Sequence, residues 1–170
     1  MSYTAHIDRF VRASLPPIDQ LPEFIFELPQ LQFPDRLNAA AALLDKAVAE
    51  GAAGRTAGIG KDIRWTYGDL QNRVNQLARV LTEDMGLVPG NRVLLRGANT
   101  PWFAACWLAV WKAGGVAVGT MPLLRAKELK QIIHLARISH ALCEASLAEE
   151  LNLARPECPE LKQVMLFGDD

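Results

Sequence analysis

Four short apolar runs, separated by segments with helical periodicity, constrain the fold of this 170-residue chain more than any other feature. The runs are residues 93–95, 116–118, 141–143 and 164–167. Runs this short, without alternating polar residues, are typical of parallel strands that are buried on both faces. Between the second and third runs, Leu129, Ile132, Ile133 and Ala136 recur with the period of a helix. The succession predicts an α/β fold, in which a parallel sheet is flanked by helices on both faces.

Residues at the predicted helix starts support this division of the chain. The sequence Thr66-Tyr67-Gly68-Asp69 has the hydroxyl and the acid of a capping box at the correct spacing. The Thr100-Pro101 pair places a capping hydroxyl before a proline at the first helical position. Ser146 with Glu149 predicts the start of a short helix before the last run. Each predicted strand is therefore followed or preceded by a helix that its own residues specify.

Residues 1–37 differ from the rest of the chain because prolines interrupt them repeatedly. Apolar side chains lie between these prolines, among them Phe24, Phe26, Leu28, Leu31 and Phe33. A solvated linker is not this apolar, so we expect an extended, proline-rich N-terminal head that packs on the domain formed by residues 38–170. Asn38 is expected to cap the first helix of that domain. Residues 54–65, with a turn at Gly60-Lys61-Asp62, predict a small hairpin.

Composition excludes several classes of function. The chain has 18 basic and 19 acidic residues, and this balance argues against a nucleic-acid binder or a polybasic membrane anchor. The longest apolar run, residues 102–111, is shorter than the roughly 18–20 residues that a membrane span needs. Cys106, Cys143 and Cys158 form no Cys-x-x-Cys pair, and the N-terminus lacks the apolar core of a secretory signal. We therefore expect free thiols and a cytoplasmic location.

No catalytic or metal-ligating set stands out. Gly54, Gly58, Gly60 and Lys61 lack the spacing of a nucleotide phosphate loop, and no G-x-G-x-x-G follows a predicted strand. His134 and His140 are six residues apart, which does not place two imidazoles on one helical face. We expect both histidines on the surface, and we assign no catalytic residue and no metal ligand.

The loop after the second apolar run is the candidate ligand site. Ligands of open parallel sheets bind at the carboxyl ends of the strands. In this loop Gly119 permits close approach to the backbone, Thr120 offers a hydroxyl, and Met121 follows. The next helix carries basic residues, which form either a solvated face or an anion-binding surface: Arg125, Lys127, Lys130 and Arg137.

Several tracts together resemble the opening of the AMP-forming acyl-CoA synthetases, in the family's order and spacing over residues 38–168. The tracts are residues 65–70, 72–78, 87–93, 98–101, 112–116 and 121–129. In its proline-rich head and in residues 36–40, the chain is most similar to the 2-aminobenzoate- and benzoate-CoA ligases. The resemblance implies a parent protein that activates a carboxylic acid, aromatic by the closer match, with ATP and Mg²⁺. By this resemblance, pyrophosphate leaves when the acyl-adenylate forms, and the CoA thiol then displaces AMP.

The resemblance also implies that the catalytic elements lie elsewhere. The family's phosphate loop, T-S-G-T-T-G-x-P-K, has no match, and Gly168-Asp169-Asp170 stands where the family chain continues toward it. We expect a fragment that scaffolds one side of the active-site cleft, is inactive alone and needs the remainder of the ligase as its partner. From this resemblance we expect part of the CoA channel to be lined by Gly119, Thr120 and Met121.

Two other interpretations remain open. The chain is alternatively a free-standing α/β interaction module that self-associates through its apolar helix, residues 102–111. A small flavodoxin-like ligand binder is disfavoured, because its phosphate loop should follow the first strand. Residues 96–100 match such a loop only in part.

Overall fold

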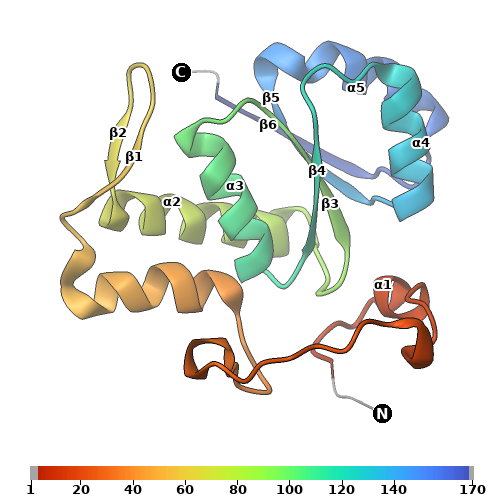
Figure 1. Ribbon diagram of the computed structural model, residues 1–170. Helices are drawn as coiled ribbons and strands as arrows, with labels where there is room; N and C mark the ends of the chain where they lie inside the picture. The colour runs from red at the N-terminus through yellow and green to blue at the C-terminus, as the bar shows by residue number, and fades with distance from the viewer. Residues whose placement is uncertain (1–3, 169–170) are drawn as a thin grey trace.

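A parallel sheet with the strand order β4-β3-β5-β6 forms the centre of the domain in the computed structural model, which describes residues 4–168 (Figure 1). The strands are β1 (Thr56–Ile59), β2 (Arg64–Thr66), β3 (Arg92–Arg96), β4 (Val116–Thr120), β5 (His140–Glu144) and β6 (Gln163–Phe167). The α-helices are α1 (Phe10–Ala13), α2 (Tyr67–Arg79), α3 (Pro101–Lys112), α4 (Ala126–Ala136) and α5 (Ala148–Ala154). Shorter 3₁₀ and π-helical turns are Ile18–Gln20, Pro29–Leu31, Ala41–Asp45, Val48–Ala52, Val80–Asp84, Ala145–Leu147 and Arg155–Glu157. The predicted α/β fold is confirmed, while Asp169 and Asp170 lie outside the described residues.

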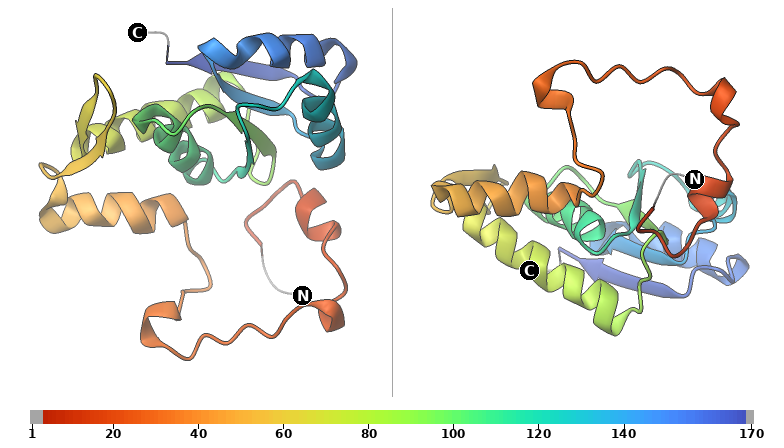
Figure 2. Two further views of the ribbon diagram at one scale, coloured as in Figure 1. Left: turned by 45° about the horizontal axis from the view of Figure 1, so that its top comes forward. Right: turned by 90° about the horizontal axis from the view of Figure 1, so that it is seen from below.

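The central strand β3 separates two apolar cores. Successive side chains of a strand point to opposite faces. Val93 and Leu95 therefore pack with α2 and α3, whereas Leu94 packs with α4 and α5. Figures 1 and 2 show these helix pairs on opposite sides of the sheet. A strand covered on both sides needs apolar residues at successive positions, which explains the unbroken run 93–95 in the sequence.

Local capping confirms two of the predicted helix starts and corrects the third. The hydroxyl of Thr66 accepts a bond from the backbone N–H of Asp69 at 3.1 Å, and the Asp69 carboxylate accepts one from the N–H of Thr66 at 2.9 Å. Thr100 caps α3 in the same way, at 3.2 Å from the nitrogen of Phe103. Ser146 does not begin a helix, because it lies inside the 3₁₀ turn Ala145–Leu147 and its hydroxyl donates to Glu144 at 3.1 Å.

The predicted hairpin is present, and its strands β1 and β2 pair in antiparallel register. It leans on the start of α3, where a Cβ added at Gly58 would meet Pro101 at 3.5 Å. Within residues 4–168, none of the helices is both long enough and apolar enough to cross a membrane.

The expectation that both histidines lie on the surface is wrong for His140. This residue begins β5 and is only 5% exposed. Its Nε2 lies 3.0 Å from the carbonyl oxygen of Met85, and its Nδ1 lies 2.8 Å from the hydroxyl of Ser139. Burial lowers the pKa of His140, although the bond to Met85 acts in the opposite direction. His134 is half exposed, as expected, and its Nδ1 lies 2.6 Å from Glu160.

The N-terminal head contacts the domain at its two ends and stands away from it between them. Apart from Leu21, every residue of the segment 12–38 is exposed. Both views in Figure 2 show this segment as an arch that is separate from the domain. At its far end, the side chain of Asn38 accepts a bond from the nitrogen of Ala41 at 3.1 Å, which confirms the predicted cap. That the whole head packs on the domain stays a prediction.

The other end of the head is anchored by an ion pair between Asp8 and Arg92. The same carboxylate accepts a bond from Asn91 at 2.9 Å, and the ring of Phe10 lies 4.7 Å from the Arg92 guanidinium carbon. Burial alone would raise the pKa of Asp8, but bonds from the N–H of Phe10, Arg92 and Asn91 outweigh it and hold this pKa below its usual value. The carboxylate is therefore charged in the folded protein at neutral pH and attaches the head to β3.

We expect Asp8→Asn to destabilise the domain and release the head. Arg92 is almost fully buried, and loss of its anionic partner should cost about 1–3 kcal/mol in the free energy of unfolding at neutral pH. Because the folded pKa of Asp8 is depressed, the difference between wild type and variant should shrink as the pH falls below about 4. Urea unfolding of both proteins, from neutral pH to below about pH 4, measures this difference in the free energy of unfolding. Asp19→Asn, an exposed change in the same head, is the control, and equal effects of both changes would contradict the anchor.

Candidate functional site

The carboxyl ends of the parallel strands meet along one edge of the sheet, and the loops that follow β3, β4 and β5 gather there. From β3 the chain runs outward to β4, whereas from the neighbouring β5 it runs the other way to β6. The two strands thus send their connections in opposite directions. Open α/β sheets bind ligands in the crevice that such a reversal creates.

Glu144, the last residue of β5, connects two of these loops. Its carboxylate accepts bonds from the backbone N–H of Ala98 at 2.7 Å and from the hydroxyl of Ser146 at 3.1 Å. Gly97 permits the tight packing of this loop, because a Cβ there would lie 2.8 Å from the ring of Phe103, 2.9 Å from that of Phe167 and 3.4 Å from the Glu144 carboxylate. The loop after β3 is consequently fixed to the end of β5.

Arg96 holds the loop that follows β4. This last residue of β3 is 1% exposed, and its guanidinium donates only to backbone carbonyls in the described contacts. The acceptors and distances are Leu147 at 3.2 Å, Met121 at 3.1 Å, Pro122 at 3.0 Å and Leu124 at 2.9 Å. A buried arginine needs acceptors for its N–H groups, and here the candidate loop supplies most of them. The loop conformation is therefore tied to the end of the sheet.

The three predicted site residues have different environments. Gly119 is exposed, and a Cβ added to it would lie 2.8 Å from the ring of Trp107. Thr120 is 8% exposed, and its hydroxyl donates to the carbonyl oxygen of Leu95 at 3.1 Å. Met121 is 63% exposed. The Thr120 hydroxyl proton is thus engaged within the sheet, while the backbone of Gly119 and the side chain of Met121 face outward.

An apolar groove of about 360 Å³ lies beside this loop. It is lined by Asn99, Thr100, Phe103, Ala104, Trp107 and Leu108. Trp107 forms one wall of the groove and also contacts Gly119, so groove and loop share a boundary. The rings of Phe103 and Trp107 meet edge to face at 5.9 Å, which fixes the shape of that wall.

Two of the four basic residues behind the loop are paired with acids. Arg125 lies 2.8 Å from Glu150, and Lys130 lies 2.8 Å from Glu157. The bonds from Arg125 and from the N–H of Ala126 hold the pKa of Glu150 below its usual value. Acidic partners compensate Arg125 and Lys130, and the guanidinium carbon of Arg137 lies 4.9 Å from the ring of Phe10, so the arrangement favours the solvated face over an anion-binding surface.

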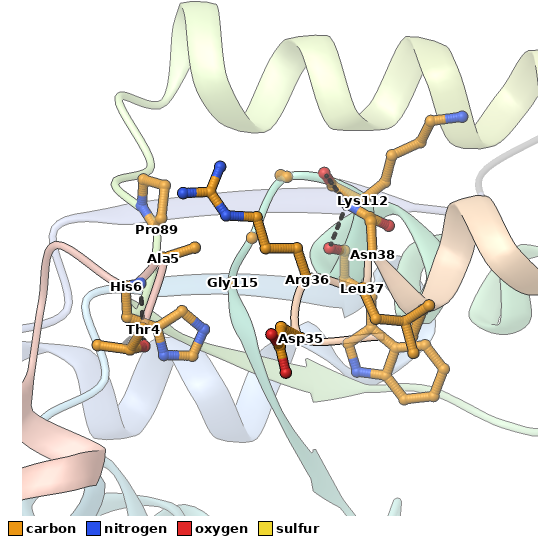
Figure 3. A pocket seen from close by; sticks show the side chains of 14 residues that line it. Thr4, Ala5, His6, Asp35, Arg36, Leu37, Asn38, Pro89, Lys112 and Gly115 are labelled. Atoms are coloured by element: carbon orange, nitrogen blue, oxygen red, sulfur yellow. Dashed lines mark hydrogen bonds between the residues drawn. The ribbon is translucent and has the colours of Figure 1, made fainter. Parts of the chain in front are cut away.

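A larger cavity, of about 730 Å³, lies at the opposite edge of the sheet (Figure 3). Its walls come from the head and from turns that precede strands β3 and β4, including Arg36, Pro89 and Gly115. Asn38 lines one side of the cavity, and its side-chain amide donates to the carbonyls of Lys112 at 3.0 Å and Trp111 at 3.4 Å. Because it opens at the amino ends of the strands, this cavity is separate from the loop at Gly119.

Among the described residues, the carboxyl edge has neither a thiol with a lowered pKa nor a cluster of metal ligands. Burial, in spite of the nearby Arg96, raises the pKa of the Cys143 thiol to about 11, so this thiol is protonated at neutral pH. Across residues 4–168, no group of three or more histidine, cysteine, aspartate or glutamate side chains gathers in a way that would hold a metal ion. The edge can position a ligand through backbone groups and apolar walls.

A family model described as "AMP-binding enzyme" matches residues 44–170. The chain belongs to this family. Among curated relatives, the benzoate–CoA ligase of Thauera aromatica is 30% identical over 140 residues, which are 82% of this chain and 27% of the relative. The mitochondrial acyl-coenzyme A synthetase ACSM5 of Mus musculus is 29% identical over 112 residues, 66% of this chain and 19% of the relative. The predicted resemblance to acyl-CoA synthetases and benzoate-CoA ligases is confirmed.

Solved structures show that the fold is shared as well. The anthranilate CoA ligase AuaEII in complex with anthranoyl-AMP superposes with a TM-score of 0.71 at 22% identity, over 76% of this chain and 25% of that one. A benzoate CoA ligase from Burkholderia xenovorans LB400 gives 0.71 at 23% identity, over 78% and 26%. This AMP-binding enzyme chain thus spans about a fifth to a quarter of the length of such proteins.

Two residues that organise the edge, Arg96 and Glu144, were missed by the sequence reasoning. The signal for Arg96 was present, since Arg92 and Arg96 flank the apolar run 93–95 on one face of a strand that must be buried. A charged residue in such a strand requires partners nearby. For Glu144 there was no comparable signal, because its partner Ala98 is a backbone amide 46 residues away.

We expect Arg96→Met to loosen the loop after β4. Methionine fills part of the volume but leaves the carbonyls of Met121, Pro122 and Leu124 without their donor, at a cost of about 2–4 kcal/mol in the free energy of unfolding. Hydrogen exchange should accelerate at residues 121–124 before the sheet itself is affected. Arg79→Met on the exposed side of α2 is the matched control. Unchanged exchange in the loop would show that Arg96 does not hold it.

Gly119→Ala should disturb the wall between loop and groove. The new methyl group would meet the Trp107 ring at 2.8 Å, so the ring must move, at a cost of about 1–3 kcal/mol. Unfolding by urea measures the cost, and near-UV circular dichroism reports the ring. Gly54→Ala, with nothing within 4 Å of its added Cβ, is the control. A variant at residue 119 as stable as this control would contradict the contact.

Proposed function

We propose that this chain is the scaffold subdomain of an aryl- or acyl-CoA ligase and that it is inactive alone. The observation that carries the proposal is the family match over residues 44–170, combined with a carboxyl edge whose loops are held in place and whose described residues form no cluster of metal ligands. The parent would join a carboxylic acid to CoA at the expense of ATP, with AMP and pyrophosphate as products. An aromatic acid is supported by the benzoate–CoA ligase among the curated relatives.

ATP, Mg²⁺ and CoA are the proposed cofactors of the parent. The described residues do not fit Mg²⁺, because no cluster of suitable ligands gathers among them. The remainder of the ligase is the proposed partner of this subdomain. We also propose a cytoplasmic location, since Cys106, Cys143 and Cys158 are all free and buried.

Within the parent, we propose that Gly119, Thr120 and Met121 line part of the path of CoA. The exposed backbone at Gly119 and the exposed side chain of Met121 support contact with a ligand. Thr120 would act by holding the loop, because its hydroxyl already donates to Leu95. The apolar groove beside Trp107 would offer an adjacent surface for an uncharged part of the ligand.

Self-association is the alternative function, and exposed apolar side chains favour it. Phe24, Phe26 and Phe33 of the head are each more than half exposed, and the groove on α3 adds Phe103 and Trp107. Apolar surface of this extent marks either an interface or an aggregation liability. Sedimentation separates the alternatives, since a monomer at high concentration argues against self-association.

A chimera tests the scaffold proposal. The matching 140 residues of the Thauera aromatica benzoate–CoA ligase are replaced by those of this chain, and benzoyl-CoA formation is measured. We expect measurable activity in the chimera and no benzoate- or 2-aminobenzoate-dependent ATP–pyrophosphate exchange with the isolated chain. Exchange by the isolated chain would contradict the proposal, as would a chimera that folds and binds ATP yet makes no benzoyl-CoA.

The same chimera tests the role of the loop. Met121→Glu places a negative charge where the phosphates of CoA would approach, so the KM for CoA should rise about tenfold, while the KM for ATP changes little. Leu135→Glu, at an exposed position of α4, is the control. Equal effects of the two variants on the KM for CoA would show that this loop does not line the path of CoA.

A further inference from the structure

The outer part of the N-terminal head, residues 13–35, is strongly acidic, and we name it the acidic segment. It has four acids and no basic side chain, which gives it a net charge of −4. The acids are Asp19, Glu23, Glu27 and Asp35, and all four are exposed. Among residues 4–168 no ion pair involves any of them. Such a segment attracts a cationic partner.

Large apolar side chains of the acidic segment are exposed as well. Phe24, Phe26 and Phe33 are 66%, 51% and 59% exposed. Their rings contact one another in series, because Phe24 stacks on Phe26 at 6.2 Å between centres and Phe26 meets Phe33 edge to face at 6.1 Å. A partner therefore finds these rings already in place. Since aromatic faces also attract cations, the segment fits a partner surface that is both basic and apolar.

The hairpin of β1 and β2 has that chemistry. Residues 54–65 contain one acid, Asp62, and three basic side chains, Arg55, Lys61 and Arg64. The three cations are exposed, and none has an acidic partner in the described part of the chain. Ile59, at the end of β1, is 69% exposed. Figure 1 shows the hairpin projecting from the domain, so its basic and apolar groups are accessible.

The acidic segment and the hairpin lie apart in the same chain. All three views in Figures 1 and 2 show them at separate places. Both ends of the head are attached to the domain, through the ion pair of Asp8 with Arg92 and through the bond from Asn38 to the carbonyl of Lys112. These attachments keep the acidic segment away from its own hairpin, so a contact between the two surfaces needs a second copy.

We propose that the acidic segment of one copy binds the hairpin of a second copy. Opposite charges attract and orient the two surfaces, and the exposed rings bury apolar area on contact. Each copy carries both surfaces, so the contact can form twice between two copies, as in a symmetric dimer. Helix α3 suits the segment less well, because its one charged side chain, Lys112, is already paired with Asp45 at 2.7 Å. The contact does not depend on the proposed ligase function.

Salt dependence is the first test. Sedimentation velocity of the full chain measures the Kd of self-association at two concentrations of NaCl. The Debye length falls from about 10 Å at 0.1 M salt to about 3 Å at 1 M, so we expect the Kd to rise about tenfold between these conditions. Association driven by apolar contacts alone would not weaken in this way.

Charge reversal in the acidic segment is the second test. The double variant Glu23→Lys with Glu27→Lys should raise the Kd at low salt by about tenfold or more. Asp84→Lys with Glu149→Lys is the matched control, because it changes the net charge equally at exposed positions outside both surfaces. The control should associate as wild type does, and equal melting temperatures show that both variants are folded.

The hairpin is tested in the same way and then by mixing. Lys61→Glu with Arg64→Glu should also abolish association, whereas Arg155→Glu with Lys162→Glu, at exposed positions elsewhere, should not. The segment variant keeps a native hairpin and the hairpin variant keeps a native acidic segment. Their mixture therefore regains one native contact and should associate where neither variant does alone.

Cross-linking identifies the contact directly. A carbodiimide joins a carboxylate to an amine without a spacer, so it should link Lys61 to Glu23 or Glu27. In a mixture of ¹⁵N-labelled and unlabelled wild type, these links should join a labelled peptide to an unlabelled one.

Several results would overturn the proposal. A chain that is still monomeric at about 1 mM and low salt has no such contact. An unchanged Kd in both double variants, or a mixture that does not associate, would assign self-association to another surface such as α3. Protection of the acidic segment from chymotrypsin in the Thauera aromatica chimera, but not in this chain at high concentration, would assign the segment to the remainder of the ligase.

Discussion

Two buried arginines on one strand determine how the rest of the domain is assembled. Arg92 and Arg96 are 5% and 1% exposed, at the two ends of β3. A buried guanidinium is tolerated only when its N–H groups find acceptors. Arg92 takes the carbonyls of Ala136 at 2.8 Å and Arg137 at 2.6 Å, at the end of α4, together with Asp8 of the head. Arg96 takes the carbonyls of the loop after β4, so one strand fixes both edges of the sheet.

The two arginines differ in the charge that their partners supply, and this difference separates the two edges. Arg92 is neutralised by the carboxylate of Asp8. Arg96 is surrounded by neutral carbonyls, and its positive charge contributes to the lowered pKa of Glu150, after the larger effects of Arg125 and Ala126. At the amino ends of the strands, Arg92 thus joins the head to the domain through its ion pair with Asp8. The carboxyl edge keeps a buried positive charge beneath its loops.

The sequence predicted those features that arise from local patterns. The apolar runs predicted the strands, and the capping residues Thr66 and Thr100 predicted two helix starts. Each of these patterns lies within a few residues of the element that it predicts. His140 was misplaced because its burial depends on Met85, which is 55 residues away and packs over β5 only in the folded domain. The loop at residues 119–121 was located from the order of the elements. The hydrogen bonds from Arg96 to this loop and from the Thr120 hydroxyl to Leu95 join different strands and loops, so a single sequence does not reveal them.

Hydrogen-bond satisfaction distinguishes the parts of this domain that are complete from the part that is not. Arg92, Arg96, Glu144 and His140 are all buried or half-buried polar groups, and each has its partners within the chain. Such groups stabilise the scaffold without any outside contribution. The cluster of Arg73 and Trp102 breaks this pattern, because Nε of Arg73 and Nε1 of Trp102 are buried without an acceptor among the described residues. Each buried donor that lacks an acceptor lowers the stability of the fold, and the apolar and cation–π contacts of the rings of Trp65 and Trp102 offset part of that cost.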